Sequence, residues 1–530
     1  MASATATPLG SSLGAAAPPR RTLGFRAWQL VVAVIVSVTP LAYLYVASLA
    51  LYLTKHLLAK NTTTFTSLLH SYSTLSLVAL TLLSAWMLGE TLWYPYHLYT
   101  ANRLRARRDP AHVAKTPKER RRLYERCLAA LAQGSDVRKS IEGWFFGAPI
   151  ETIGRENMVQ WFAWAMWDAE PHDLTESETL EISQFIADTE RAVGGGVVIR
   201  EGFNPDVKCM RLTIDDMQHL HRPFVYYVVI SAMHGIAAVF LRSQGFVAKS
   251  VENDDDSSVP QHYFYRPAKV SNKKNDDDDD RDSATANSPP PLPIVFIHGI
   301  GIGYLHYATL IARLPTTVDV FLIDWPHVAM RRAETIPTIP TAVASFTRML
   351  TNHNHTRGAC FVGHSLGSAA ISWMLHHNPA LVASAVFLDP VAFLLVDPSV
   401  AYNFVYRPPT TVLELLMHYF VARELYIAHS LARHFNWSQN ILFREELPGN
   451  NNNNNGRQPG PPASVVPTCV VLSAWDQVVP SAAVRKYLAE DPRVDLCWVE
   501  DMTHGQMMFD AKCMDMVKGK IERACGLVRA

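Results

Sequence analysis

The sequence lacks an excess of charge of either sign, because 48 Lys and Arg residues balance 48 Asp and Glu residues along 530 positions. Without a basic excess the chain has no electrostatic footprint for nucleic acid, so we expect no nucleic-acid partner. Cysteine is also scarce: the seven cysteines are scattered, and none belongs to a C-x-x-C pair. This spacing argues against zinc and thiol redox motifs and favours reduced thiols in a cytosol-facing domain.

Two further ligand patterns are absent. The acidic runs Asp254–Asp256 and Asp276–Asp280 lack the spaced ligands of a calcium-binding loop. The glycine-rich stretch after Gly299 lacks the G-x-G-x-x-G spacing of a dinucleotide-binding turn. We therefore expect no metal and no cofactor, and we interpret residues 252–290 as an acidic disordered insertion around one short strand, 262–267.

Long apolar runs are present near the N-terminus. No charged residue lies between Trp28 and Leu53, which exceeds the roughly 20 residues that cross a bilayer core. A second run, Leu75–Tyr94, contains one acid, Glu90, and ends in aromatic residues typical of a membrane interface. The sequence predicts a disordered tail over residues 1–27 and two transmembrane helices within 28–96.

Basic residues set the expected orientation of this hairpin. Arginines precede the first run and follow the second, whereas only Lys55 and Lys60 lie between them. Because positive charge accumulates on the cytosolic side, both ends of the hairpin should face the cytosol. We expect an integral protein of the endoplasmic reticulum or another endomembrane, with its catalytic domain in the cytosol.

The following residues, 97–243, are expected to form a helical membrane-proximal region. Its last apolar run, Phe224–Leu241, is of borderline length for a span, and a span here would move the rest of the chain to the lumen. We interpret this run as a buried or membrane-resting helix. Met158, Trp161 and Trp164 recur at helical spacing, which favours core packing over a cofactor site.

Residues 244–526 alternate strand-like and helix-like segments. Apolar runs such as 292–299, 318–326, 358–365, 383–391, 468–476 and 494–501 are separated by helical patterns or loops. This alternation predicts an α/β domain with a mostly parallel sheet and helices on both faces. Residues 391–464 contain an aromatic, apolar stretch that we expect to form a helical cap.

The segment "GACFVGHSLGS" places Ser365 between a strand-like run and a helix-like one. Glycines two residues before and after the serine give the G-x-S-x-G pattern of a nucleophile elbow, in which the hydroxyl stands exposed above the sheet edge. We interpret the adjacent His364 as a packing or hydrogen-bonding residue. Serine at this point of the pattern also argues against epoxide hydrolases and dehalogenases, whose nucleophile is aspartate.

A base and an acid follow in the order that a serine triad needs. Asp476 closes a later strand-like run and His504 follows the next one, so the predicted catalytic residues are Ser365, Asp476 and His504. Asp389 and Asp501 are rival acids; element order favours Asp476. For the oxyanion, "VFIHGIGIGY" offers the amide of Ile300, which we expect to act with the amide of Leu366.

These motifs carry a resemblance. Residues of about 245–526 resemble the α/β-hydrolase superfamily of serine hydrolases through "HGIG", "GHSLG", "SAWDQVVP" and "THG". With the N-terminal hairpin, "GWFFGAP" and "WFAWAMW", the whole chain resembles membrane-anchored α/β-hydrolase proteins of fungi and protists. The resemblance implies a serine hydrolase that faces lipid.

The expected function is cleavage of a carboxylic ester, through an acyl-enzyme, with a lipid or another hydrophobic ester as substrate and the membrane as partner. Anchoring favours long-chain esters, because a tethered site meets bilayer lipid at high local concentration. Two alternatives stay open: an acyltransferase that uses the same serine, and a catalytically silent lipid-binding or scaffold protein that retains the fold.

Overall fold

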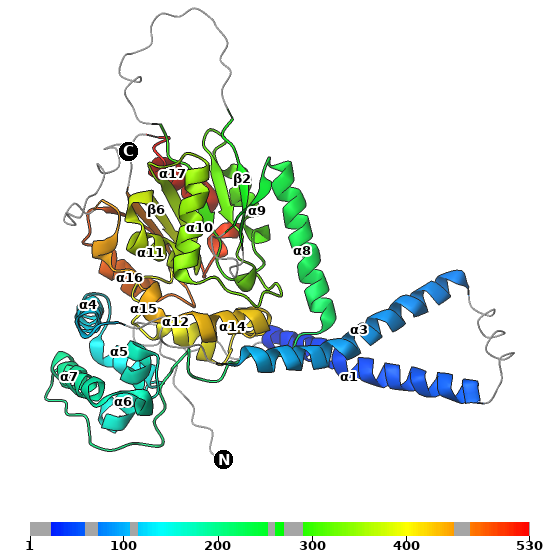
Figure 1. Cartoon of the computed structure of the whole chain (residues 1–530), viewed down its shortest axis with the longest axis horizontal. Coiled ribbons are helices and arrows are strands. Elements are labelled where there is room, and N and C mark those ends of the chain that lie inside the picture. The colour runs from blue at the N-terminus through cyan, green and yellow to red at the C-terminus, as the bar shows by residue number, and fades with distance from the viewer. Residues whose placement is uncertain are drawn as a thin grey trace, which may run out of the picture.

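The computed structural model describes residues 23–58, 73–106, 115–252, 260–269, 290–449 and 467–528. Figure 1 shows an α/β domain, a smaller helical unit beside it, and two long helices that extend away from the body. Of the expected tail only residues 23–27 are described, and they already belong to the first helix. Both acidic runs lie outside the described residues, and so does the run of asparagines 450–455 within the expected cap.

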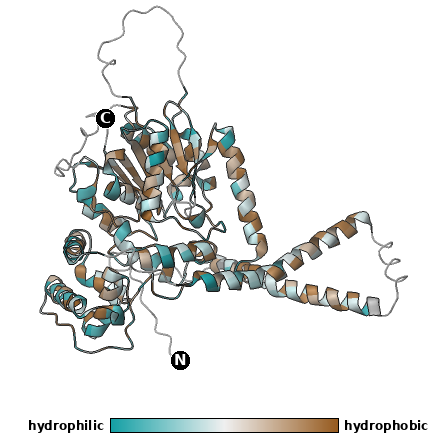
Figure 2. Cartoon of the chain, viewed as in Figure 1, coloured by the Kyte–Doolittle hydropathy of each residue, from teal (hydrophilic) through white to brown (hydrophobic). Residues whose placement is uncertain are grey.

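The two extended helices are α1 (Leu23–Leu58) and α3 (Thr74–Leu104), with Pro40 and Pro95 inside them. Both are long and apolar enough to cross a membrane. Figure 2 shows hydrophobic residues recurring along their protruding halves. Hydroxyls on α1 have acceptors on α3: Tyr43 Oη donates to the carbonyl of Thr91 at 2.9 Å. Such pairing satisfies polar groups that lipid would leave without partners.

The helical unit consists of α4 (Pro117–Gly134), α5 (Val137–Trp144), α6 (Arg155–Phe162) and α7 (Glu176–Val193). Thr116 with Glu119 and Thr175 with Glu178 form capping boxes that start α4 and α7. Met158, Trp161 and Trp164 are buried among other aromatic residues, which confirms their interpretation as core.

The third apolar helix, α8 (Phe224–Ser243), is also long and apolar enough to cross a membrane. In the structure, however, it lies along the flank of the α/β domain, at a steep angle to α3 (Figure 1). Its inner face is packed: His234 Nε2 contacts the carbonyl of Ala329 at 2.8 Å, and Leu241 is buried. Its outer face exposes Val228, Ile236 and Val239.

The sheet has eight strands in the order β1-β2-β4-β3-β5-β6-β7-β8. Strand β2 is antiparallel to both of its neighbours, and the other pairs are parallel, so the predicted α/β fold is confirmed. The strands are β1 (Val247–Val251), β2 (Gln261–Arg266), β3 (Ile294–Ile297), β4 (Val320–Ile323), β5 (Ala359–His364), β6 (Val382–Leu388), β7 (Thr468–Ser473) and β8 (Val494–Val499). The sequence analysis did not identify β1, whose residues are mostly exposed.

Helices cover both faces of the sheet. Alternate residues of β3 belong to separate apolar clusters: Val295 packs with α10 and α11, and Phe296 packs with α9 and α17. The covering helices are α9 (Ala308–Arg313), α10 (Ile339–Asn352), α11 (Gly367–His377), α16 (Ser481–Leu488) and α17 (Ala511–Ala524). Between β6 and β7 stands the cap, with α12 (Ser399–Ala401), α13 (Val412–Leu416), α14 (Leu425–His434), α15 (Trp437–Asn440) and two π-helical turns, Tyr402–Tyr406 and Met417–Ala422.

Candidate active site

Ser365 lies in the sharp turn between β5 and α11 and has a left-handed backbone, with φ of 51°. That conformation is strained for a residue with a side chain. The turn also brings Gly367 against β3: a Cβ there would lie 2.3 Å from the carbonyl oxygen of Ile297. The glycine pattern therefore exists because the turn is too tight for side chains, and it lifts the serine hydroxyl above the sheet edge.

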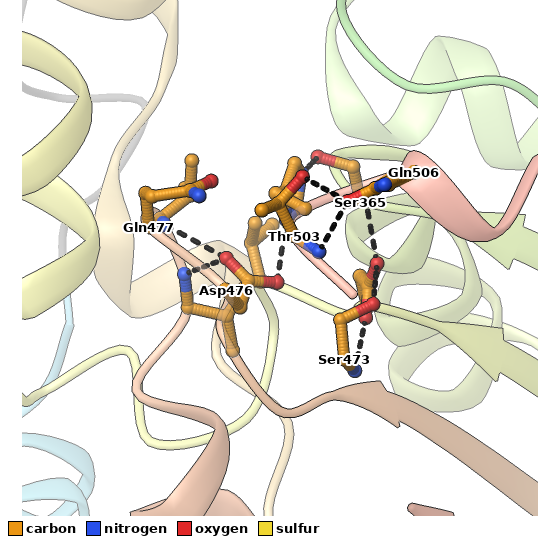
Figure 3. A network of polar contacts seen from close by, with 12 residues as sticks. Ser365, Ser473, Asp476, Gln477, Thr503 and Gln506 are labelled. Atoms are coloured by element: carbon orange, nitrogen blue, oxygen red, sulfur yellow. Dashed lines mark hydrogen bonds and ion pairs between the residues drawn. The ribbon is translucent and has the colours of Figure 1, made fainter. Parts of the chain in front are cut away.

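The structure brings Ser365, His504 and Asp476 into one chain of hydrogen bonds. His504 Nε2 lies 2.9 Å from Ser365 Oγ, and Nδ1 lies 2.7 Å from Asp476 Oδ2. The other carboxylate oxygen of Asp476 accepts the amides of Val478 and Val479. Figure 3 shows Asp476, in the loop after β7, and Ser365 in the same network of polar contacts. The acid is thus held in one orientation by its own loop.

The two rival acids occupy different positions. Asp389 is fully buried after β6 and accepts hydrogen bonds from the amide and hydroxyl of Ser473 and from the amide of Gly505. Asp501 has a left-handed backbone, with φ of 57°, in the exposed turn after β8. Asp389 therefore fastens the loop that carries His504, whereas Asp476 contacts the imidazole itself.

Charge within this cluster controls the protonation of His504. Burial alone would lower the pKa of His504, but the adjacent Asp476 carboxylate overcomes that effect and raises the pKa to about 9. Burial, together with repulsion from Asp476, raises the pKa of Asp389 to about 6. The Asp476 carboxylate therefore makes the imidazole a stronger base, and the unprotonated ring is the form that can accept the serine proton.

Asp389, Asp476 and His504 offer oxygen and nitrogen atoms within 4.8 Å of one another, which raises the question of a metal. Both ring nitrogens of His504 already lie within hydrogen-bonding distance of Ser365 and Asp476. Both oxygens of Asp389 accept from Ser473 or Gly505. A cation would have to displace these bonds, so the donor set fits a proton relay better than metal ligation.

The loop after β3 lies directly against the nucleophile. A Cβ on Gly299 would approach Ser365 Cβ to 2.9 Å, so only glycine fits there. The next residue, Ile300, lines the same cavity as Ser365 and Leu366. Among the described residues, the amides of Ile300 and Leu366 donate to no protein acceptor. Both residues that carry the predicted oxyanion donors therefore line the cavity beside the serine.

A tyrosine that the sequence did not reveal as a site residue fixes this loop. Tyr307 Oη accepts the Gly299 amide at 2.9 Å and contacts His364 Nδ1 at 2.6 Å. Tyr304 Oη donates to the carbonyls of Phe296 and Ile323. The two tyrosines thus tie the Gly299 loop to the elbow and to the strands. Tyr304 and Tyr307 follow the glycine-rich stretch closely, and this position was the only indication in the sequence that they belong to the site. The sequence does not show where their hydroxyls point.

A cavity of about 60 Å³, here named the near cavity, opens beside Ser365. Apart from Ser365 its lining is apolar, and it is drawn from the elbow, the cap and the helical unit. A larger cavity of about 300 Å³ shares Leu366, Leu431 and Phe435 with it and has polar groups such as Ser430 and Asn440. The serine therefore borders the small apolar space, and Leu366, the residue after it, borders both this space and the larger, partly polar one.

The sheet order, the elbow at Ser365 and the helices on both faces define an α/β-hydrolase fold. Residues 294–514 match the sequence profile of a family described as the alpha/beta hydrolase family. No curated protein matches the chain.

Several solved structures are similar to part of this chain at low identity. A bacterial membrane phospholipase A is 15% identical with a TM-score of 0.37, covering 57% of this chain and 93% of that one. Carboxylesterase CesB from Bacillus subtilis is 12% identical with a TM-score of 0.34, covering 57% and 99%. Naproxen esterase from Bacillus subtilis is 12% identical with a TM-score of 0.36, covering 56% and 97%. These likenesses are too low to carry a substrate to this chain.

Proposed function

We propose that this chain is a membrane-anchored serine hydrolase that cleaves a carboxylic ester of a lipid. The observation that carries the proposal is the hydrogen-bonded relay from Asp476 through His504 to Ser365, which ends at an apolar cavity. A protein that only binds lipid has no use for a relay aimed at a serine hydroxyl.

The geometry supports a two-step reaction. His504 Nε2 takes the proton of Ser365 as the oxygen attacks the ester carbonyl, and Asp476 holds the imidazolium that forms. The amides of Ile300 and Leu366 bind the oxyanion. The same imidazole then protonates the leaving alcohol. Water, activated by His504, releases the acid from the acyl-enzyme, and the serine regains its proton.

The membrane part of the proposal rests on the apolar helices. Helices α1 and α3 cross the bilayer as a hairpin, while α8, which packs on the α/β domain, lies with its outer face against the membrane surface. This arrangement keeps the α/β domain in the cytosol, on the endoplasmic reticulum or another endomembrane. The likeness to anchored fungal and protist hydrolases stays a prediction.

Two experiments test the proposal. The full chain in lipid nanodiscs should hydrolyse carboxylic esters, and Ser365→Ala should abolish this activity while Ser372→Ala, at a buried serine of the following helix α11, retains it. If both variants keep full activity, Ser365 is not the nucleophile.

The second experiment tests the topology. A C-terminal tag should be digested by protease added to intact microsomes; protection of the tag would make α8 a third span.

A further inference from the structure

Behind the near cavity lies a second, closed space in the helical unit. This far cavity measures about 30 Å³ and is lined by α4, α5 and α6, including Leu128, Leu131 and Ile141. Its two hydroxyl-bearing residues, Tyr124 and Thr189, bond to each other at 2.9 Å. The remaining lining is apolar, so the space resembles the small dry cavities that bind apolar groups rather than water.

Three tryptophans separate the two cavities. Trp144, Trp164 and Trp437 line both spaces, and all three are at least nine-tenths buried. Two of them come from the helical unit, outside residues 294–514, and the third comes from the cap. Part of the wall of the near cavity is therefore built by the helical unit, which lies outside the matched α/β segment.

Each indole is fixed by its N–H group. Trp144 donates to the carbonyl of Val396 at 2.8 Å, and Trp164 donates to Thr213 Oγ1 at 2.8 Å. Trp437 donates to the carbonyl of Ala165 at 2.9 Å. Rotation of any ring would leave a buried donor without its acceptor, which proteins rarely tolerate. The three rings thus form a rigid partition and not a gate.

The size of the near cavity then limits what fits. A dry cavity of about 150 Å³ accepts benzene, with its six carbons. A cavity of about 60 Å³ in proportion holds a chain of roughly two to three carbons. The larger cavity on the other side of Leu366, about 300 Å³, has room for the bulkier half of an ester.

We propose, building on the hydrolase function above, that the near cavity is the subsite for a short hydrocarbon half of the ester, with Trp144, Trp164 and Trp437 as its floor. The substrate class is then a lipid ester in which one half, acyl or alcohol, is short and the other is bulky. The helical unit is part of the substrate site and sets its length limit.

The test uses the full chain in nanodiscs with two series of esters. One varies the acyl chain from two to twelve carbons with a fixed alcohol, and the other varies the alcohol of an acetate ester. We expect kcat/KM in one series to fall beyond about three carbons. Trp164→Ala joins the two cavities and should raise kcat/KM on the order of tenfold for chains two carbons past the limit. Trp164→Phe loses the hydrogen bond but keeps the partition, so its limit should stay unchanged.

A second variant tests the same inference if Trp164→Ala fails to fold. Ala401 is half-buried and lines the near cavity, so Ala401→Leu should shorten the limit, whereas Ala483→Leu on α16, outside this cavity, should not. Equal rates for short and long chains in both series would overturn the inference, and so would a limit that neither variant moves. Absence of all ester hydrolysis would instead refute the underlying hydrolase function, and the inference with it.

Discussion

Asp476 Oδ2 lies 2.7 Å from Nδ1 of His504, on the side of the ring opposite Ser365. Replacement of Asp476 by Asn offers the ring an amide that can favour the wrong tautomer, with a proton on Nε2. We expect Asp476→Asn to reduce ester hydrolysis by about 10⁴-fold without unfolding the protein. Steady-state kinetics and a melting curve check both parts.

Asp389→Asn is the matched control. Its side chain contacts Ser473 and Gly505, not the imidazole of His504, so its loss should shift the His504 loop without removing the relay. We expect a decrease of about tenfold to a hundredfold, well short of the effect at Asp476. If Asp389→Asn were the more damaging change, the acid of the relay would be Asp389.

The pH dependence follows from the raised pKa of His504, about 9, caused by the Asp476 carboxylate against the effect of burial. A general base works only when unprotonated, so kcat/KM should rise with pH and level off above about pH 9. In Asp476→Asn the pKa of His504 falls, so the rise of kcat/KM should occur at lower pH. The profile should also level off at a much lower value of kcat/KM. Profiles of kcat/KM with an uncharged ester from pH 5 to 10 measure the rise in both proteins. A rise at the same pH in both would contradict the effect of Asp476 on the pKa of His504.

The sequence predicted which polar side chains meet at the candidate site, but not the residues that hold them in place. Ser365, Asp476 and His504 could be found because each residue follows a strand-like run, and the carboxyl ends of parallel strands share one edge of the sheet. Tyr307 could not be assigned, because its hydroxyl meets Gly299 and His364 only after three separate segments fold together.

The sequence is also limited in what it predicts for the helical unit and the apolar helices. Helical spacing predicted that Trp161 and Trp164 would be core residues, but spacing says nothing of which cavity a ring borders. Glu90 was visible as one acid in an apolar run, and only the structure shows it capping α8. Contacts between distant segments depend on tertiary packing, which local patterns do not encode.

Tyr307 gives a third prediction. Tyr307→Phe removes the oxygen that accepts the Gly299 amide and binds His364, leaving both polar groups buried without it. We expect a loss of stability of about 1–3 kcal/mol and a drop in kcat larger than the change in KM, because the oxyanion loop is no longer held. Denaturant unfolding and steady-state kinetics test this; unchanged kcat would assign Tyr307 to stability alone.

Glu90 gives a fourth. Its carboxylate is fully buried and accepts the amides of Phe224 and Val225 at 2.7 and 3.0 Å, which joins α3 to the start of α8. Glu90→Ala should destabilise this joint by about 0.5–2 kcal/mol, and faster hydrogen exchange should be confined to the first turn of α8. Glu90→Gln keeps one acceptor oxygen and should exchange at an intermediate rate. Unchanged exchange in both variants would show that the cap does not hold the helix.

The central claim is that Ser365 is an activated nucleophile, and its most direct test is the position of a covalent adduct. The full chain, treated with a fluorophosphonate and digested, should carry one phosphonyl group on the peptide that contains Ser365, as located by mass spectrometry. Ser365→Ala should remain unmodified, and Asp476→Asn should react far more slowly. An adduct on another residue, or no adduct on the folded wild-type chain, would contradict the account.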